Sequence, residues 1–343
     1  MRNQQSPRAA TIGLFLTMAV VSVPLQAEPD TPAKTGASKL EYANPRPGAA
    51  GHRAHIEWQG AYPKLGAKNL KVVGTMRPPD GFIGNMTYDA ATDRLYLVSL
   101  GRPTNPNNSS IYELDASTGK VLNQAALPLI GDFGDPVYID GYVYQPVYHE
   151  STMYKISVKK GEFGKIEKEI ALPTHADLNL TDESHPYPFI EFGGAGVTKD
   201  KKIIFHADDV GEFVTLEPDT GKILSRVRTI KALGGLDSVA HNKRELVIAN
   251  SDPRGGYCAL SFPPALSRTP EQKDISWALL DARSGEVLAS LRTQNSRAYA
   301  ASLALKRHEP GGKGAKDYGK FTFFAFGEEG ILTLEWNPAH NAY

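Results

Sequence analysis

Short runs of alternating apolar and polar residues recur along the chain, and one pair of runs is repeated almost letter for letter. The segment SIYELDASTGKVL at 110–122 alternates, turns at a Gly and resumes with apolar residues. The segment EFVTLEPDTGKIL at 212–224 repeats it, and SWALLDARSGEVL at 276–288 repeats it more loosely. A period of two interrupted by a Gly turn predicts two β-strands joined in a hairpin, with the Gly supplying a positive φ at the corner.

Another pair of apolar runs precedes each of these hairpins, so each unit predicts four strands. The upstream pairs are FIGNMTYDAATDRLYLVSL, FGGAGVTKDKKIIFHADD and LGGLDSVAHNKRELVIANSD. A fourth unit is FGDPVYIDGYVYQPVYH followed by STMYKISVKKGEFGKIEKEIAL. The units follow one another at roughly 40 to 60 residues, which is the period expected of β-propeller blades.

The last unit has only three strands, in RAYAASLALK, KFTFFAFGEE and GILTLEWNP. The segment KNLKVVGTM at 68–76 can supply the missing outer strand, and this pairing would cover an otherwise open sheet edge. The sequence therefore predicts an all-β protein, a single β-propeller of about five four-stranded blades closed by an N-terminal strand. A sixth blade is the alternative if residues 56–65 contribute.

The first 27 residues have the composition of a signal peptide. Arg2 and Arg8 precede an apolar run that is too short to span a bilayer, and Ala27 offers a small residue for cleavage. Residues 28–55 are rich in Pro, Ala and Gly and predict a flexible leader, which leaves 56–343 for the propeller. We expect a periplasmic or secreted protein with no stable membrane anchor; a retained N-terminal anchor is the alternative.

Composition excludes several classes of function. Lys and Arg total 38, and Asp and Glu also total 38, so the chain lacks the basic surplus of a nucleic-acid-binding protein. Cys258 is the only cysteine, which rules out an internal disulfide and a cysteine zinc cluster. The sequence contains no GxSxG, GxGxxG or GxxxxGK[ST] motif, so a serine elbow and the usual phosphate-binding loops are not indicated.

Polar residues stand at the start of the predicted first strands, which line the centre of a propeller. Four of these strands begin with IGN, FGD, FGG or LGG. The residues expected to converge at one mouth of the channel are Asn85, Asp135, Glu191 and Asp237, with Arg297 from the last unit. Their oxygen donors suit Ca²⁺ or a similar divalent metal, and Arg297 suits substrate binding. The alternative is that they are solvated polar residues at strand ends.

Histidines form a second candidate set. The segment FHADD places His206 beside two acidic residues, and His175 and His185 lie on the longest loop expected between blades. Histidine beside carboxylates can bind a metal or transfer protons. We therefore interpret Asp237, His206 and His185 as candidate catalytic residues, with polar turn residues as the alternative interpretation.

Two stretches resemble a known family. MTYDAATDRLYLVSL resembles the first-blade signature of the SMP-30/gluconolactonase family, and GLDSVAHNKRELVIAN resembles a later blade of that family. The resemblance implies a divalent metal held by Glu, Asn and Asp from separate blades, with lactone- or ester-hydrolysing activity. YELDASTGKVL is also similar to the repeat of YVTN-type and quinoprotein propellers. The quinone-binding members carry Trp after the Gly turn, where this chain has Leu122, Leu224 and Leu288.

Three classes of function are compatible with these sequence features. The first is an exported hydrolase of a lactone or ester that depends on a divalent metal. The second is a non-catalytic propeller that binds a small molecule or a partner protein, and the third is an accessory subunit for a dehydrogenase or electron transfer. The hydrolase is the preferred hypothesis because acidic residues occur at several of the predicted channel positions.

Overall fold

The computed structural model describes fifteen segments of the chain: residues 70–79, 84–99, 109–129, 134–147, 150–179, 189–190, 192–207, 212–228, 233–241, 244–251, 275–285, 287–292, 302–312, 317–327 and 330–338. Backbone contacts divide the chain into two units, residues 1–39 and 40–343, and every described residue belongs to the second. The predicted signal peptide, the predicted leader and the extra strand expected at 56–65 lie outside the described residues.

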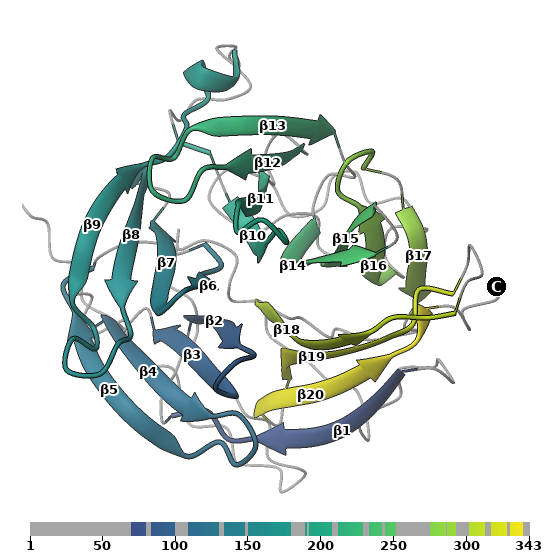
Figure 1. Ribbon diagram of the computed structural model, residues 1–343, viewed down its shortest axis with the longest axis horizontal. Helices are drawn as coiled ribbons and strands as arrows, with labels where there is room; N and C mark the ends of the chain where they lie inside the picture. The colour runs from purple at the N-terminus through teal and green to yellow at the C-terminus, as the bar shows by residue number, and fades with distance from the viewer. Residues whose placement is uncertain are drawn as a thin grey trace, which may run out of the picture. The chain divides into compact units, whose positions relative to one another are not determined.

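Within these segments, twenty strands form five antiparallel sheets of four strands each (Figure 1). Blade 1 consists of β2 (Gly84–Asp89), β3 (Arg94–Ser99), β4 (Ser109–Asp115) and β5 (Val121–Leu127). Blade 2 consists of β6 (Val137–Ile139), β7 (Tyr142–Val147), β8 (Thr152–Ser157) and β9 (Ile166–Ala171). Blade 3 consists of β10 (Phe192–Val197), β11 (Ile203–Ala207), β12 (Glu212–Leu216) and β13 (Ile223–Arg228).

Blade 4 consists of β14 (Leu233–His241), β15 (Arg244–Ser251), β16 (Ile275–Asp281) and β17 (Val287–Arg292). Blade 5 consists of β18 (Leu303–Glu309), β19 (Lys320–Gly327), β20 (Gly330–Trp336) and β1 (Leu70–Met76). A single turn of 3₁₀ helix, η2 (Ala176–Leu178), lies between blades 2 and 3. In the described part of the chain, no helix is both long enough and apolar enough to cross a membrane.

The first strands of the five blades form a ring. Each of β2, β6, β10 and β14 contacts the first strand of the next blade, and β18 contacts β2. Figure 1 shows the five sheets arranged around a common centre, with these strands innermost. The fold is therefore the predicted all-β propeller, with five four-stranded blades.

The ring is closed by β1, as the sequence predicted. This strand pairs antiparallel with β20, placing Lys71 opposite Glu335 and Met76 opposite Ile331. In Figure 1 the purple β1 lies beside the yellow β20. The predicted closure is confirmed, and the sheet edge of β20 is covered.

Apolar side chains fill the space between neighbouring blades. In β19, Phe321 and Phe323 belong to a core cluster that contains Leu246 of blade 4. The next residue, Phe324, points the other way and packs in a cluster with Met86 of blade 1. Successive side chains of a strand face opposite sides of the sheet, so each blade is covered on both faces only by its two neighbours.

Ionic side chains also link neighbouring blades. Among the described residues, three such ion pairs are Lys306–Asp93 at 3.2 Å, Lys201–Asp140 at 2.7 Å and Lys155–Asp219 at 2.7 Å. Asp93 also accepts a hydrogen bond of 2.7 Å from the Tyr88 hydroxyl. These partly exposed pairs orient the turns more than they stabilise the fold, because surface ion pairs contribute little free energy.

The glycines of the repeated hairpins have the expected positive φ, with values of 73° at Gly119, 68° at Gly221 and 71° at Gly285. The structure adds a second reason for glycine at these corners. A Cβ atom on Gly221 would lie 2.0 Å from the carbonyl oxygen of Ala171, at the end of the outer strand of the preceding blade. Each hairpin corner is therefore also a contact between blades.

Replacing Gly221 with Ala should destabilise the protein more than replacing Gly161, which has a φ of 83° but no atom within 4 Å of its added Cβ. Gly161→Ala should cost about 1 kcal/mol, for the left-handed backbone alone. Gly221→Ala should cost about 1–3 kcal/mol more, because the neighbouring blade must move. Urea unfolding followed by circular dichroism measures both, and equal losses would show that the inter-blade contact is unimportant.

Candidate functional site

Two of the predicted site residues lie together where blades 1 and 2 meet. Asn85 is on β2, and Asp135 stands two residues before β6. The Asn85 side-chain amide donates a 2.8 Å hydrogen bond to the carbonyl oxygen of Gly134, the residue before Asp135. Both side chains are buried, with 0% and 1% of their surface exposed. The structure thus brings this predicted pair together from two separate blades.

Gln145 belongs to the same cluster and was not predicted from the sequence. Its Nε2 donates to the carbonyl oxygens of Gly134, at 2.7 Å, and of Pro146, at 3.0 Å. Its Oε1 is buried and has no hydrogen-bond partner among the residues that the structure describes. Gln145 lies in the second strand of its blade, whereas the predicted site residues came mainly from the starts of first strands. The available signal was Pro146, an unusual residue inside a strand.

The innermost strand of blade 2 is interrupted beside this cluster. β6 has three residues, whereas the innermost strands of the other blades have six to nine. Proline cannot donate a ladder hydrogen bond, and in place of a paired strand the Gly134 N–H donates to the Pro146 carbonyl at 3.0 Å. A Cβ on Gly134 would lie 2.5 Å from the carbonyl oxygen of Phe192 in blade 3. Irregular backbone, rather than a regular ladder, therefore holds Asp135 in place.

Asp237 occupies a different position, on β14 against β18 of the next blade. Its Oδ1 accepts a 2.9 Å hydrogen bond from the Ser238 N–H, and its Oδ2 accepts a hydrogen bond from the Leu305 N–H. Burial raises the pKa of this carboxyl from its ordinary 3.8 to about 7, and the two N–H donors oppose that rise. A carboxyl that titrates near neutral pH is suited to both accepting and donating a proton.

The buried side of β14 is closely packed. A Cβ on Gly196 of β10 would lie 2.8 Å from the Ser238 nitrogen and 3.1 Å from Asp237 Cα. The Ser238 hydroxyl donates 2.8 Å to Glu245 on β15. The backbone around Asp237 is therefore fixed by blade 3 on one side and by its own sheet on the other.

His206 lies on β11, the second strand of blade 3. Its side chain is fully buried and meets the ring of Phe213 edge-on, at 5.4 Å between centroids. His175 is also buried and immediately precedes η2. The sequence predicted His206 after the second strand of this blade, and the structure places it within that strand, with its side chain buried.

The remaining predicted site residues, Glu191, His185 and Arg297, lie outside the described residues. Where the structure is described, no three His, Cys, Asp or Glu side chains form a group that could hold a metal ion. The divalent metal stays a prediction.

The strand topology defines the class of this protein as a β-propeller. No protein-family model and no curated protein matches the chain. Among solved structures, glutaminyl cyclase from Myxococcus xanthus is similar at 10% identity, over 78% of this chain and 96% of that one, with a TM-score of 0.48.

BamB from Moraxella catarrhalis is similar at 11% identity, over 74% of this chain and 85% of that one, with a TM-score of 0.35. A protein of unknown function from Bacteroides caccae is similar at 12% identity, over 72% and 74%, with a TM-score of 0.40. With scores this low, the assignment as a β-propeller depends on the chain's own topology, and the resemblance to the SMP-30/gluconolactonase family stays a prediction.

Asp237 should make stability depend on pH. The pKa of Asp237 is about 7 in the folded protein and 3.8 ordinarily. Between these two pH values the folded state therefore binds a proton that the unfolded state has lost. The free energy of unfolding should therefore fall as pH rises from about 4 to about 7. We expect a fall of about 2 kcal/mol, less than the full pKa difference implies, because Asp237 is only partly shielded from solvent. Asp237→Asn should lack this component, which denaturant unfolding at several pH values measures. Parallel pH profiles for the two proteins would show that the pKa is not raised.

Proposed function

We propose that this β-propeller binds a small molecule at the centre of its ring and hydrolyses an ester or lactone there, with Asp237 as the proton-transfer group. The observation that carries the proposal is the placement of Asp237. Its carboxylate is held between the innermost strands of two blades by the backbone N–H groups of Ser238 and Leu305. These bonds fix its orientation without neutralising its charge with a cation.

Hydrolysis of an ester requires a group that can both accept and donate a proton. Hydrolysis of an ester removes a proton from the attacking water and returns a proton to the departing alkoxide, while the acyl–oxygen bond breaks. A carboxyl with a pKa near 7 is present in both protonation states at neutral pH. Its environment therefore suits it to serve first as base and then as acid.

The proposed site includes a divalent cation such as Ca²⁺ near Asn85 and Asp135, with Glu191 as a further ligand. The support is the type of donor, since carboxylate and amide oxygens are the ligands that Ca²⁺ prefers. Asn85 and Asp135 also come together from two blades. A bound cation would supply polarisation of the substrate carbonyl. His206 and His185 remain proposed as further proton carriers, and Arg297 as a substrate-binding residue.

A binding protein without catalysis is the second candidate. The observation that favours it is that Asn85 and Gln145 both donate hydrogen bonds to the Gly134 carbonyl. These polar side chains therefore already have a structural role. In that case the buried polar cluster would mainly shape a binding surface for a small molecule or a partner protein. In either case we propose a periplasmic or secreted location, supported by the sequence of residues 1–27.

A panel of lactones and esters tests the hydrolase, with and without added metal. Turnover by the wild-type protein should fall about 100-fold or more in Asp237→Asn, because that change keeps the shape and removes the proton-transfer group. Asp219→Asn is the matched control, since Asp219 lies on an outer turn and pairs with Lys155. Turnover that survives unchanged in Asp237→Asn would remove this residue from the mechanism, and no turnover on any substrate would favour the binding protein.

Metal binding has its own measurement. Added Ca²⁺ should raise the melting temperature of the purified protein, because a ligand that binds only the folded state stabilises it by mass action. The increase should be smaller in Asp135→Asn, which removes one charged donor. Melting curves that do not move with Ca²⁺, Mg²⁺, Mn²⁺ or Zn²⁺ would contradict the proposed cation.

A further inference from the structure

The side-chain amide of Gln145 is held in one orientation by two backbone carbonyls. Its Nε2 donates to the carbonyl oxygen of Gly134 at 2.7 Å and to that of Pro146 at 3.0 Å. The amide oxygen could not take this place, because it only accepts hydrogen bonds, as the two carbonyls do. Both N–H groups of the Gln145 amide are therefore used, and Oε1 is the end of the amide that is turned away from these carbonyls.

The Gly134 carbonyl is shared between two blades. It also accepts a hydrogen bond of 2.8 Å from Nδ2 of Asn85, so one amide from blade 1 and one from blade 2 meet on a single oxygen atom. A carbonyl oxygen has two lone pairs, and the two amides occupy both. The fold thus uses the donor end of the Gln145 amide, while its acceptor end stays available for another group.

That acceptor end is buried. Gln145 has 0% of its surface exposed, and Oε1 has no hydrogen-bond partner among the described residues. Buried polar atoms in native proteins are normally satisfied, and an oxygen that only accepts can be satisfied only by a hydrogen-bond donor or a cation. Asp135, which follows Gly134 and is 1% exposed, adds a negative charge to the cluster. A buried negative charge favours a cation over a neutral donor such as water.

We propose that Gln145 is a ligand of the bound cation, with Oε1 coordinating it beside oxygens of Asn85 and Asp135. This inference rests on the cation of the proposed function and adds to it a ligand from the second strand of blade 2. The three side chains offer oxygen donors, which Ca²⁺ prefers, and side-chain amide oxygens are among its usual ligands. None of the three offers the nitrogen or sulfur donors that Zn²⁺ favours.

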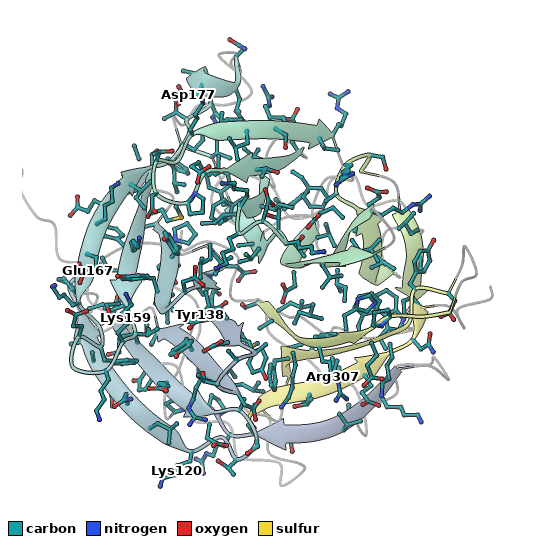
Figure 2. The ribbon with its side chains drawn as sticks, in the orientation of Figure 1. Lys120, Tyr138, Lys159, Glu167, Asp177 and Arg307 are labelled. Atoms are coloured by element: carbon teal, nitrogen blue, oxygen red, sulfur yellow. The ribbon has the colours of Figure 1, made fainter. Side chains whose placement is uncertain are left out.

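The junction between blades 1 and 2 is firmly packed beside the cluster. Tyr138 of β6 stacks on Tyr96 of β3, with 5.4 Å between the ring centroids and 14° between the ring planes. Figure 2 shows Tyr138 where these two blades meet. β6 begins two residues after Asp135, so the stack helps to fix the backbone that carries this carboxylate. Ligands that are already in position lose little conformational freedom when the cation binds.

Isothermal titration calorimetry with CaCl₂ tests the proposal, on purified protein first dialysed against a chelator. Gln145→Met should raise the dissociation constant for Ca²⁺ about tenfold or more, because Met has a similar length but no oxygen ligand. Gln124→Met is the matched control: it makes the same change at an exposed position of β5 and should leave the affinity as it is. Equal affinity in Gln145→Met and the wild type would overturn the role of Gln145.

Gln145→Glu separates a ligand from a residue that only supports the backbone. Met and Glu both lack the Nε2 donor, so a purely structural role would weaken Ca²⁺ binding equally in the two variants. A ligand role predicts opposite effects, because Glu keeps an oxygen and adds a charge and should bind Ca²⁺ at least as tightly as the wild type. Melting curves without Ca²⁺ show whether each variant is folded. Weaker binding by Gln145→Glu would contradict the proposal.

The titration contains no substrate, so its result does not depend on whether the protein hydrolyses esters. If Asp135→Asn weakens Ca²⁺ binding and Gln145→Met does not, the proposed cation stands and only the role of Gln145 fails. A wild-type protein that binds no Ca²⁺ would overturn both, and would indicate that a buried water satisfies Oε1. Tighter binding of Zn²⁺ than of Ca²⁺ would contradict a ligand set made of oxygens.

Discussion

Mutual coverage of neighbouring sheets is the constraint on which the rest of this structure depends. A four-stranded blade has two apolar faces, as the opposite directions of Phe323 and Phe324 show, and it cannot cover either face by itself. Blade 5 therefore needs blade 1 as much as it needs blade 4, and the row of blades has to close. The pairing of β1 with β20 achieves this with backbone hydrogen bonds, so the two parts of the chain that are farthest apart in the described sequence share one sheet.

The same constraint explains the glycine corners and the position of Asp237. The corner at Gly221 touches the outer strand of the preceding blade, and the carboxylate of Asp237 accepts an N–H from the innermost strand of the following blade. The distance between neighbouring blades is thus set both by contacts at the rim and by contacts at the centre. Because the hydrogen bonds of Asp237 join two blades, its carboxylate is held more firmly than one on a surface loop. A proton-transfer group needs such a fixed position.

Much of the fold could be predicted from the sequence, because local patterns determine it. The period of two, the Gly turns and the missing strand of the last unit were sufficient to predict the blades and their closure. The candidate site was harder to predict from the sequence than the fold. Asn85 and Asp135 were predicted to be close because both stand at the starts of first strands, whereas Gln145 joins them through the backbone of Gly134, which no pattern marks. The raised pKa of Asp237 depends on its burial within the folded ring, and burial by parts of the chain distant in sequence is not encoded locally.

Because β1 closes the ring, the order in which the chain is synthesised determines when the propeller can finish folding. β1 is the first of the described strands to be synthesised, and its partner β20 is the last. Until β20 exists, β1 has no sheet to join, and the apolar sides of blades 1 and 4 that blade 5 covers stay open to solvent. Native pairing between such distant segments is slow to form, because a long loop must first be closed. The unfinished chain is therefore the form most exposed to aggregation or proteolysis, and that vulnerable period ends only when the final strand has been made and the ring can close.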